Sequence, residues 1–115
     1  MLKIKRVYEK AEASDGTRFL VERLWPRGMK KEALKMKAWL KDAAPSADLR
    51  NWFGHDPLKW SEFQKRYQAE LKSNPEAWDP ILQAANQGDV TLLYSAHDTE
   101  HNNALALKKF LEKKL

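Results

Sequence analysis

The pattern of apolar residues is most informative at residues 19–25, where Phe, Leu, Val, Leu and Trp are interrupted only by Glu22 and Arg23. Apolar residues with so little alternation are typical of a strand that is buried on both faces of a parallel sheet. Pro26 has no N–H to donate and Gly28 tolerates a positive φ, so we expect the strand to end at Pro26 and the chain to turn there.

Three further segments have the pattern of strands. Residues 2–8 alternate between apolar and polar, and residues 90–94 form a short β-branched run bounded by a turn. Residues 35–40 alternate well enough for a third short strand, with a helix as the competing interpretation. The loop at residues 9–17 contains a Ser-Asp-Gly turn, and its length permits either a parallel crossover or a hairpin between the strands that it joins.

Capping signals divide residues 46–87 into three helices. Ser46 is the expected N-cap and Gly54 the expected stop of the first, which is short. An Asp-Pro pair at residues 56–57 and an Asn-Pro pair at residues 74–75 then begin two longer amphipathic helices.

Two more helical segments complete the pattern: a single turn at residues 30–34 and a final helix from about residue 99 to residue 114. There is no internal repeat and no low-complexity linker. The sequence therefore predicts one α/β domain over residues 1–115, with a small, mostly parallel sheet of about four strands and helices packed around it.

Composition narrows the classes of function. The 115 residues include no cysteine, which excludes disulfides, thiolate metal sites and thiol nucleophiles. The chain has no signal-peptide pattern and no segment of transmembrane length, so we expect a cytoplasmic protein that does not contact a membrane. The net charge of +5 suggests an acidic partner such as nucleic acid, but the lysines cluster at expected helix ends and exposed faces. Nucleic acid is therefore possible but not the favoured partner.

A candidate site follows the last predicted strand, where residues 95–103 read Ser-Ala-His-Asp-Thr-Glu-His-Asn-Asn before the final helix. A strand-to-helix turn binds anions through free backbone N–H groups, and ligands of open α/β sheets bind at the carboxyl edge. Arg23 and Arg27 would add guanidinium groups there if the two strands are neighbours. The predicted ligand-binding residues are Arg23, Trp25, Arg27, Ser95, Asn102 and Asn103.

Structural explanations compete with this site. Asp98 and Glu100 would serve equally well as a helix cap, and they partly cancel the attraction for an anion. Glu22 and Arg23 point to opposite faces of a strand, so each can simply pair with a charge from a covering helix.

Histidines are the candidate acids or bases of the turn because their ordinary pKa lies near neutrality. The predicted catalytic residues are His97 and His101, with Asp98 as an orienting group, and His55 is a further residue that folding could bring to them. A hydrolase with Ser95, Thr99 or Tyr94 as the nucleophile is allowed, although no nucleophile motif is present. His97 and His101 are four residues apart but lack a third ligand, so we expect neither a metal nor a cofactor.

Motifs along nearly the whole chain carry a family resemblance. They are Asp15-Gly16-x-Arg18, Leu24-Trp25-Pro26-Arg27-Gly28, Ala44-Pro45-Ser46, Leu49-Arg50-x-Trp52-Phe53-x-His55-Asp56, Phe63-x-x-x-Tyr67, Thr91-Leu92-Leu93-Tyr94 and His101-Asn102-Asn103-Ala104. The chain resembles the YeaO-like family of uncharacterised bacterial proteins, within the domain-of-unknown-function group numbered 488. The resemblance implies an α/β domain with a polar pocket at one sheet edge and supplies no activity.

The chain also departs from that broader group. Longer relatives have a cysteine at the end of the last core strand and a Cys-His-Arg triplet at the start of the following helix. The corresponding positions here look like Tyr94 and Asn102-Asn103-Ala104. Thiol-based or phosphatase-like chemistry is therefore not expected. The leading hypothesis is a domain that binds a small anionic, phosphate- or nucleotide-like ligand, with a histidine as candidate acid or base, and the alternative is a non-enzymatic interaction or nucleic-acid-binding module.

The two arginines around Pro26 should differ in kind. Arg23 belongs to the predicted strand and should be the more buried of the two. Arg23→Ala should therefore lower the free energy of unfolding by about 3 to 5 kcal/mol, because the buried partners of its guanidinium would be left unpaired. Arg27→Ala should keep the stability and lose the ligand, because an exposed arginine contributes little to folding. Equal and negligible shifts of both denaturant midpoints would contradict this expectation.

Overall fold

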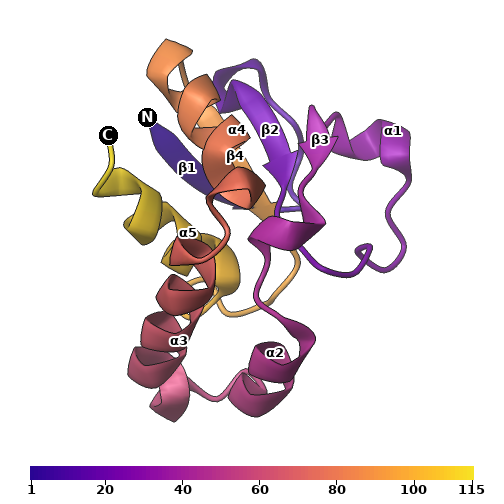
Figure 1. Ribbon diagram of the computed structural model, residues 1–115. Coiled ribbons are helices and arrows are strands. Elements are labelled where there is room, and N and C mark those ends of the chain that lie inside the picture. Colours follow the sequence, from indigo (N-terminus) through magenta and orange to yellow (C-terminus); the bar gives the residue numbers. More distant parts are fainter.

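The four strands form one sheet in which every neighbouring pair is parallel. This computed structural model describes residues 1–115. Across the sheet, the strands are β1 (Leu2–Arg6), β4 (Val90–Tyr94), β2 (Thr17–Leu20) and β3 (Ala38–Trp39) (Figure 1). The prediction of a small parallel sheet is confirmed. The first two strands of the chain are parallel but not adjacent, because the last strand lies between them.

Five helices surround the sheet: α1 (Lys31–Leu34), α2 (Ala47–Phe53), α3 (Trp60–Lys72), α4 (Pro75–Gln87) and α5 (Asn103–Glu112). Most capping signals in the sequence are confirmed, but Asn74 precedes α4 without a side-chain capping hydrogen bond. The Ser46 hydroxyl accepts the Leu49 N–H, Gly54 adopts a left-handed conformation at the end of α2, and the Asp56 carboxylate accepts the Leu58 N–H. None of the helices has the length and apolar composition needed to span a membrane.

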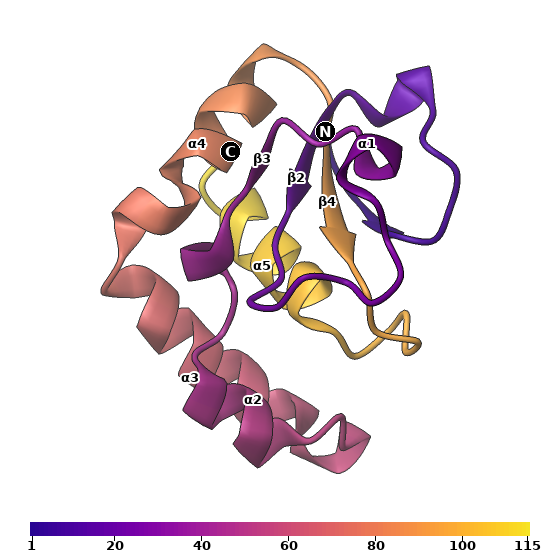
Figure 2. The same ribbon diagram turned by 90° about the vertical axis from the view of Figure 1, so that its right-hand side faces the viewer.

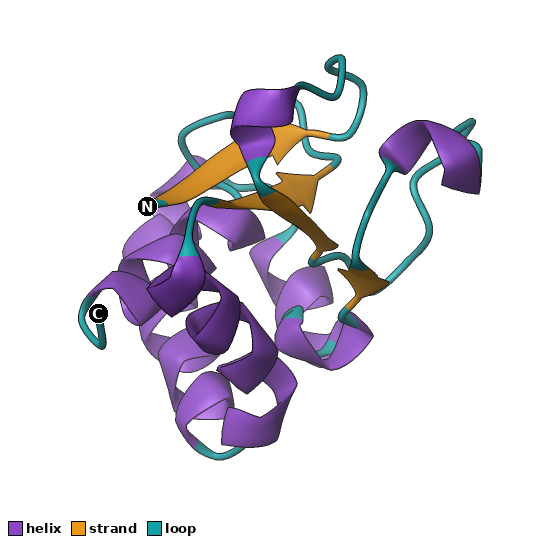
Figure 3. Cartoon of the chain, turned by 90° about the horizontal axis from the view of Figure 1, so that it is seen from above, coloured by secondary structure: helices purple, strands orange, loops and turns teal.

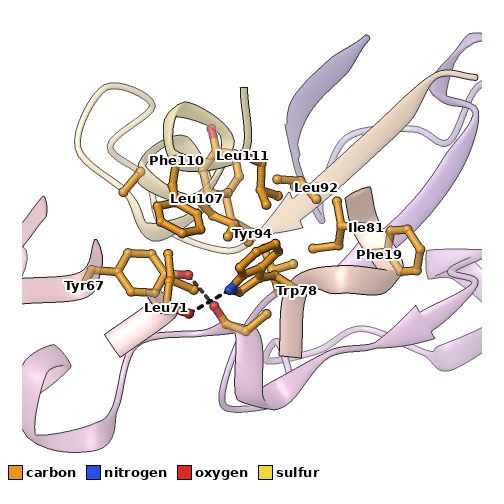
Figure 4. Close-up of a cluster of buried hydrophobic side chains, with 14 of the residues drawn as sticks. Phe19, Tyr67, Leu71, Trp78, Ile81, Leu92, Tyr94, Leu107, Phe110 and Leu111 are labelled. Atoms are coloured by element: carbon orange, nitrogen blue, oxygen red, sulfur yellow. Dashed lines mark hydrogen bonds between the residues drawn. The ribbon is translucent and has the colours of Figure 1, made fainter. Parts of the chain in front are cut away.

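The larger apolar core lies between one face of the sheet and helices α2 to α5 (Figure 4). Seen from above, the longer helices gather on that side (Figure 3). Phe19 and Leu92 reach this core from β2 and β4, as expected for strands without polar faces. Polar groups within it are satisfied, since Trp78 donates its ring N–H to the Leu71 carbonyl at 2.8 Å and Tyr67 donates its hydroxyl to the Ala43 carbonyl.

A second, smaller apolar group covers the opposite face. It contains Leu20 and Leu93 from the strands and Leu34 from α1, with Trp25 and Trp39 packed against it. Figure 2 shows α1 on one side of the strands and α4 and α5 on the other. Residues 19–21 are therefore buried on both faces, which confirms the interpretation of this segment as a core strand.

The end of the central strand differs from the sequence-based expectation. β2 ends at Leu20 and not at Pro26, and the Val21 N–H makes one more hydrogen bond, to the Leu93 carbonyl at 3.2 Å. The chain leaves the sheet there because the partner strand β4 also ends and the next side chain, Glu22, accepts hydrogen bonds from residue 95. Leu24, apolar in sequence, is 65% exposed in the loop that follows.

The last helix also begins later than expected, at Asn103 rather than near residue 99. The Asn102 side chain is its N-cap, since its carbonyl oxygen accepts the Leu105 N–H at 2.8 Å. Asp98 instead holds the preceding turn, where one carboxylate oxygen accepts the N–H groups of Glu100 and His101. Asp98 and Asn102 are both residue types that cap helices, and the cap of α5 is Asn102, which directly precedes its first residue.

A buried charged network joins β1 to the start of β2 on the face opposite the larger core. Asp15, 5% exposed, accepts hydrogen bonds from Lys5, from the Arg18 guanidinium and from the Glu12 N–H. Thr91 of β4 donates its hydroxyl to the Asp15 carbonyl at 2.7 Å. Burial alone would raise the pKa of Asp15, but the hydrogen bonds from Glu12, Lys5 and Arg18 prevail and lower it to about 2.

Asp15→Asn should destabilise the fold in a pH-dependent way. The Asp15 pKa is lowered in the folded state, so its contribution is present above pH 4 and is lost as the pH falls towards 2. At pH 7 we expect a loss of about 3 kcal/mol from leaving buried cations unpaired. This difference should shrink by roughly 2 kcal/mol between pH 4 and pH 2. Urea unfolding across this range measures it, with the exposed Asp42→Asn as the control, and a difference that stays constant with pH would contradict the assignment.

Candidate functional site

A cavity of about 760 Å³ opens at the carboxyl edge of the sheet. Its wall is built from the segments that follow β2 and β4, from the end of α2 and from the start of α5. The polar residues of the wall are Glu22, Arg27, Arg50, Asn51, His55, Ser95, His97, Asp98, Asn102 and Asn103. The apolar part includes Tyr8, Leu24, Trp25, Pro26, Phe53 and Phe63.

The topology explains why the cavity lies there. The segment after β2 packs on the face covered by α1, whereas the helix after β4 packs in the larger core on the opposite face (Figure 2). Two adjacent parallel strands whose following segments leave to opposite faces open a crevice between their ends, which is where ligands bind in open α/β sheets.

Arg27 and Arg50 line this cavity, and neither guanidinium group makes a hydrogen bond or an ion pair within the protein. Arg27 is exposed and Arg50 is half-buried. The other arginines all donate hydrogen bonds to protein groups; they are Arg6, Arg18, Arg23 and Arg66. The cavity therefore presents two free guanidinium groups, the side chains best suited to a bidentate contact with a carboxylate or phosphate.

Glu22 lies between the ends of β2 and β4. One of its carboxylate oxygens accepts the Ser95 N–H at 2.9 Å and the Ser95 hydroxyl at 3.3 Å. Burial raises the pKa of Glu22, and the Ser95 hydrogen bonds and the charges of Arg50 and His55 oppose that shift only in part. Glu22 thus links the two strand ends at the cavity and is a carboxylate whose charge is costly to bury.

The three histidines have different surroundings. His97 lines the cavity and is exposed, with Nδ1 at 3.5 Å from the Arg6 guanidinium. His55 also lines the cavity and has a left-handed backbone (φ 57°). His101 is outside the cavity wall, where its ring meets Trp60 edge-on, with the ring centroids 5.5 Å apart.

Asp98 pairs with His101 and not with His97. The Nδ1 of His101 is 2.9 Å from one Asp98 oxygen, and the other oxygen accepts two backbone N–H groups. The hydrogen bond from the Glu100 N–H, followed by that from His101, lowers the pKa of Asp98. Both oxygens are thus occupied, although Asp98 lies on the cavity wall. No group of three or more His, Asp or Glu side chains is arranged to hold a metal ion.

Several residues predicted to bind a ligand also have structural partners. Asn102 uses both ends of its amide, since its NH₂ group donates to the Asp98 carbonyl at 3.0 Å while its oxygen caps α5. Asn103 donates to the Val21 carbonyl at 2.6 Å. Trp25 donates to the Met29 carbonyl at 2.8 Å. These residues shape the wall of the cavity, and each donates one hydrogen bond within the protein.

Arg23 lies away from this cavity. Its guanidinium donates to the carbonyl groups of Pro45 at 2.9 Å and Ala44 at 3.2 Å, beside a smaller hollow of about 280 Å³. Arg23 is half-buried and Arg27 is exposed, in the order expected from the sequence. Arg23 therefore fastens the segment before α2.

Arg50 and Glu22 belong to the cavity wall but are not among the ligand-binding residues predicted from the sequence. Arg50 directly follows Leu49, a buried residue of the short helix α2. From the sequence alone, an arginine at such a position is expected to point into solvent. One sequence signal does include Arg50, because it belongs to the motif of the family resemblance that extends from Leu49 to Asp56.

Comparison with known proteins decides the family. The family model described as the inactive DUF488-N3 subclade matches residues 1–115. The chain belongs to the DUF488 family. It is 42% identical over 110 residues to the uncharacterised protein YeaO of Escherichia coli (strain K12), a match that covers 96% of both chains. It is 34% identical over 110 residues to the uncharacterised proteins Mb3100c of Mycobacterium bovis and Rv3073c of Mycobacterium tuberculosis, covering 96% of this chain and 92% of theirs. No solved structure matches it significantly.

The DUF488 assignment confirms the resemblance read from the motifs. Asp15 and Arg18 of the first motif belong to the buried charged network, and Arg27 and His55 of later motifs lie on the cavity wall. Tyr94, the last residue of β4, is 2% exposed in the core, and burial raises its pKa.

Glu22→Gln should fold and should be no less stable than the wild type at pH 7. The Glu22 pKa is raised in the folded state, so the charged carboxylate carries a penalty at neutral pH that disappears on protonation below its ordinary pKa of 4.5. Glutamine removes this penalty and keeps an oxygen that can accept the Ser95 N–H. Any gain in stability should therefore vanish by about pH 4. Urea midpoints measured from pH 8 to pH 4 test this, and a glutamine variant that is clearly less stable at pH 7 would contradict it.

Proposed function

We propose that this DUF488 protein binds a small ligand with an anionic, phosphate- or nucleotide-like group in the cavity at the carboxyl edge of its sheet. The observation that carries the proposal is the pair of free guanidinium groups of Arg27 and Arg50 on one cavity wall. His55 and His97 stand on the same wall and add donors for the anion.

Electrostatics favours an anion at Arg50 in particular. Arg50 is half-buried, and its guanidinium makes no hydrogen bond or ion pair with the protein that would offset lost hydration. A phosphate or carboxylate would supply charge-assisted bonds, each contributing about 1.5 to 3 kcal/mol. Arg27, from the loop after β2, would supply a second guanidinium group to the same anion.

The ligand is bound rather than turned over in this proposal. The candidate catalytic groups are occupied elsewhere: Asp98 pairs with His101, and the Ser95 hydroxyl donates to Glu22. His97 has the Arg6 guanidinium beside its Nδ1, so a protein cation already lies next to one of its two ring nitrogens. The description of the matching DUF488 subclade as inactive supports the same conclusion.

Anion binding should depend on the two free arginines. Inorganic phosphate and a panel of organophosphates, titrated into labelled protein, should shift the ¹H–¹⁵N NMR signals of residues around the cavity. Arg50→Ala should weaken the tightest of them by roughly tenfold or more, since tenfold corresponds to about 1.4 kcal/mol. Arg27→Ala should weaken it less, because its side chain is more exposed.

The matched control is Arg66→Ala, which removes the same charge from α3 at an exposed position outside the cavity wall. Its affinities should equal those of the wild type. Unchanged shifts in the Arg27→Ala/Arg50→Ala double variant, or no shift with any anion at millimolar concentration, would refute the proposed function.

A further inference from the structure

The carboxylate of Glu22 offers a second anchor in the same cavity. One of its oxygens is occupied by Ser95, whereas the other accepts no hydrogen bond from the protein. No buried side-chain oxygen or nitrogen of the protein lacks a partner, so the free Glu22 oxygen is accessible and not sealed in the core. Glu22 lies on the cavity wall.

This carboxylate is not neutralised by its surroundings. The charges of Arg50 and His55 act on Glu22, yet neither residue forms an ion pair or a hydrogen bond with it. Asp98, the other carboxylate of the wall, has both oxygens occupied. The cavity therefore presents one free carboxylate oxygen and two free guanidinium groups, all without protein partners.

Unpaired groups of opposite charge in one cavity select for a ligand that carries both charges. A simple anion would satisfy the arginines and be repelled by Glu22, and a simple amine would satisfy Glu22 and be repelled by the arginines. Trp25, Phe53 and Phe63 supply apolar wall in the same cavity, and its volume of about 760 Å³ exceeds what a bare phosphate ion fills.

We infer that the ligand is a small zwitterion, whose anionic group binds at Arg27 and Arg50 and whose protonated amine binds the free oxygen of Glu22. This inference rests on the proposed function, since it assigns a second contact to a ligand already held by its anion. It makes Glu22 the residue that distinguishes an amine-bearing ligand from a plain anion.

Two matched series of probes test the inference on the wild-type protein. The first is L-phenylalanine, its N-acetyl derivative without the amine charge, and its amide without the carboxylate. The second is phosphoethanolamine, ethyl phosphate and ethanolamine. In at least one series the zwitterion should bind tenfold or more tightly than either singly charged relative, as measured by NMR titration.

Glu22→Gln should then remove this advantage and leave the affinity for the anion-only probe unchanged or improved, because the repulsive carboxylate is gone. The matched control is Glu100→Gln, which removes an exposed carboxylate that is not part of the cavity wall. It should leave the preference for the zwitterion intact.

The outcomes separate the two proposals. If anion-only probes bind as tightly as the zwitterions in both series, and this binding is lost in Arg50→Ala, the zwitterion inference is overturned and the proposed function stands. If neither anions nor zwitterions bind, both fail. A zwitterion preference that survives Glu22→Gln also overturns the assignment of Glu22.

Discussion

The structure depends on β4, which pairs with β1 on one side and with β2 on the other and in which every residue is buried. Leu92 faces the helices and Leu93 the opposite cluster, and both are fully buried, which contributes roughly 2 kcal/mol for each side chain. Because β1 and β2 both run parallel to β4, the carboxyl ends of all three strands meet at one edge. The candidate site lies at that edge.

The same edge is held together by the polar groups that follow the strands. Ser95 directly follows β4, and Glu22 lies close to the end of β2. The hydrogen bonds that Ser95 donates to Glu22 therefore join the two chain segments at the point where they diverge. This contact occupies one oxygen of the carboxylate, and the second accepts no hydrogen bond from the protein. In the proposed function, this edge holds a charged ligand without the help of a cysteine, since the chain contains none.

Local features of the fold could be predicted from the sequence, and non-local ones could not. Ser46 and Gly54 bound α2 as expected because a cap and a left-handed stop involve only neighbouring residues. The end of β2 at Leu20 depends on where β4 ends, and the position of β4 between β1 and β2 depends on pairing across the whole chain. The edge that carries the candidate site was therefore predictable. The contribution of Arg50 from α2 was not, since helix periodicity does not indicate which other segments lie next to the polar face of a helix.

The most direct test of the account is anomalous diffraction from crystals soaked in selenate, a tetrahedral oxyanion that resembles phosphate in shape and contains a heavy atom. The account predicts a selenium peak in the cavity, with selenate oxygens at hydrogen-bonding distance from the guanidinium groups of Arg27 and Arg50. An empty cavity in which Arg50 pairs instead with Glu22 would contradict it, because the two charges would then neutralise each other and leave nothing for a ligand to bind.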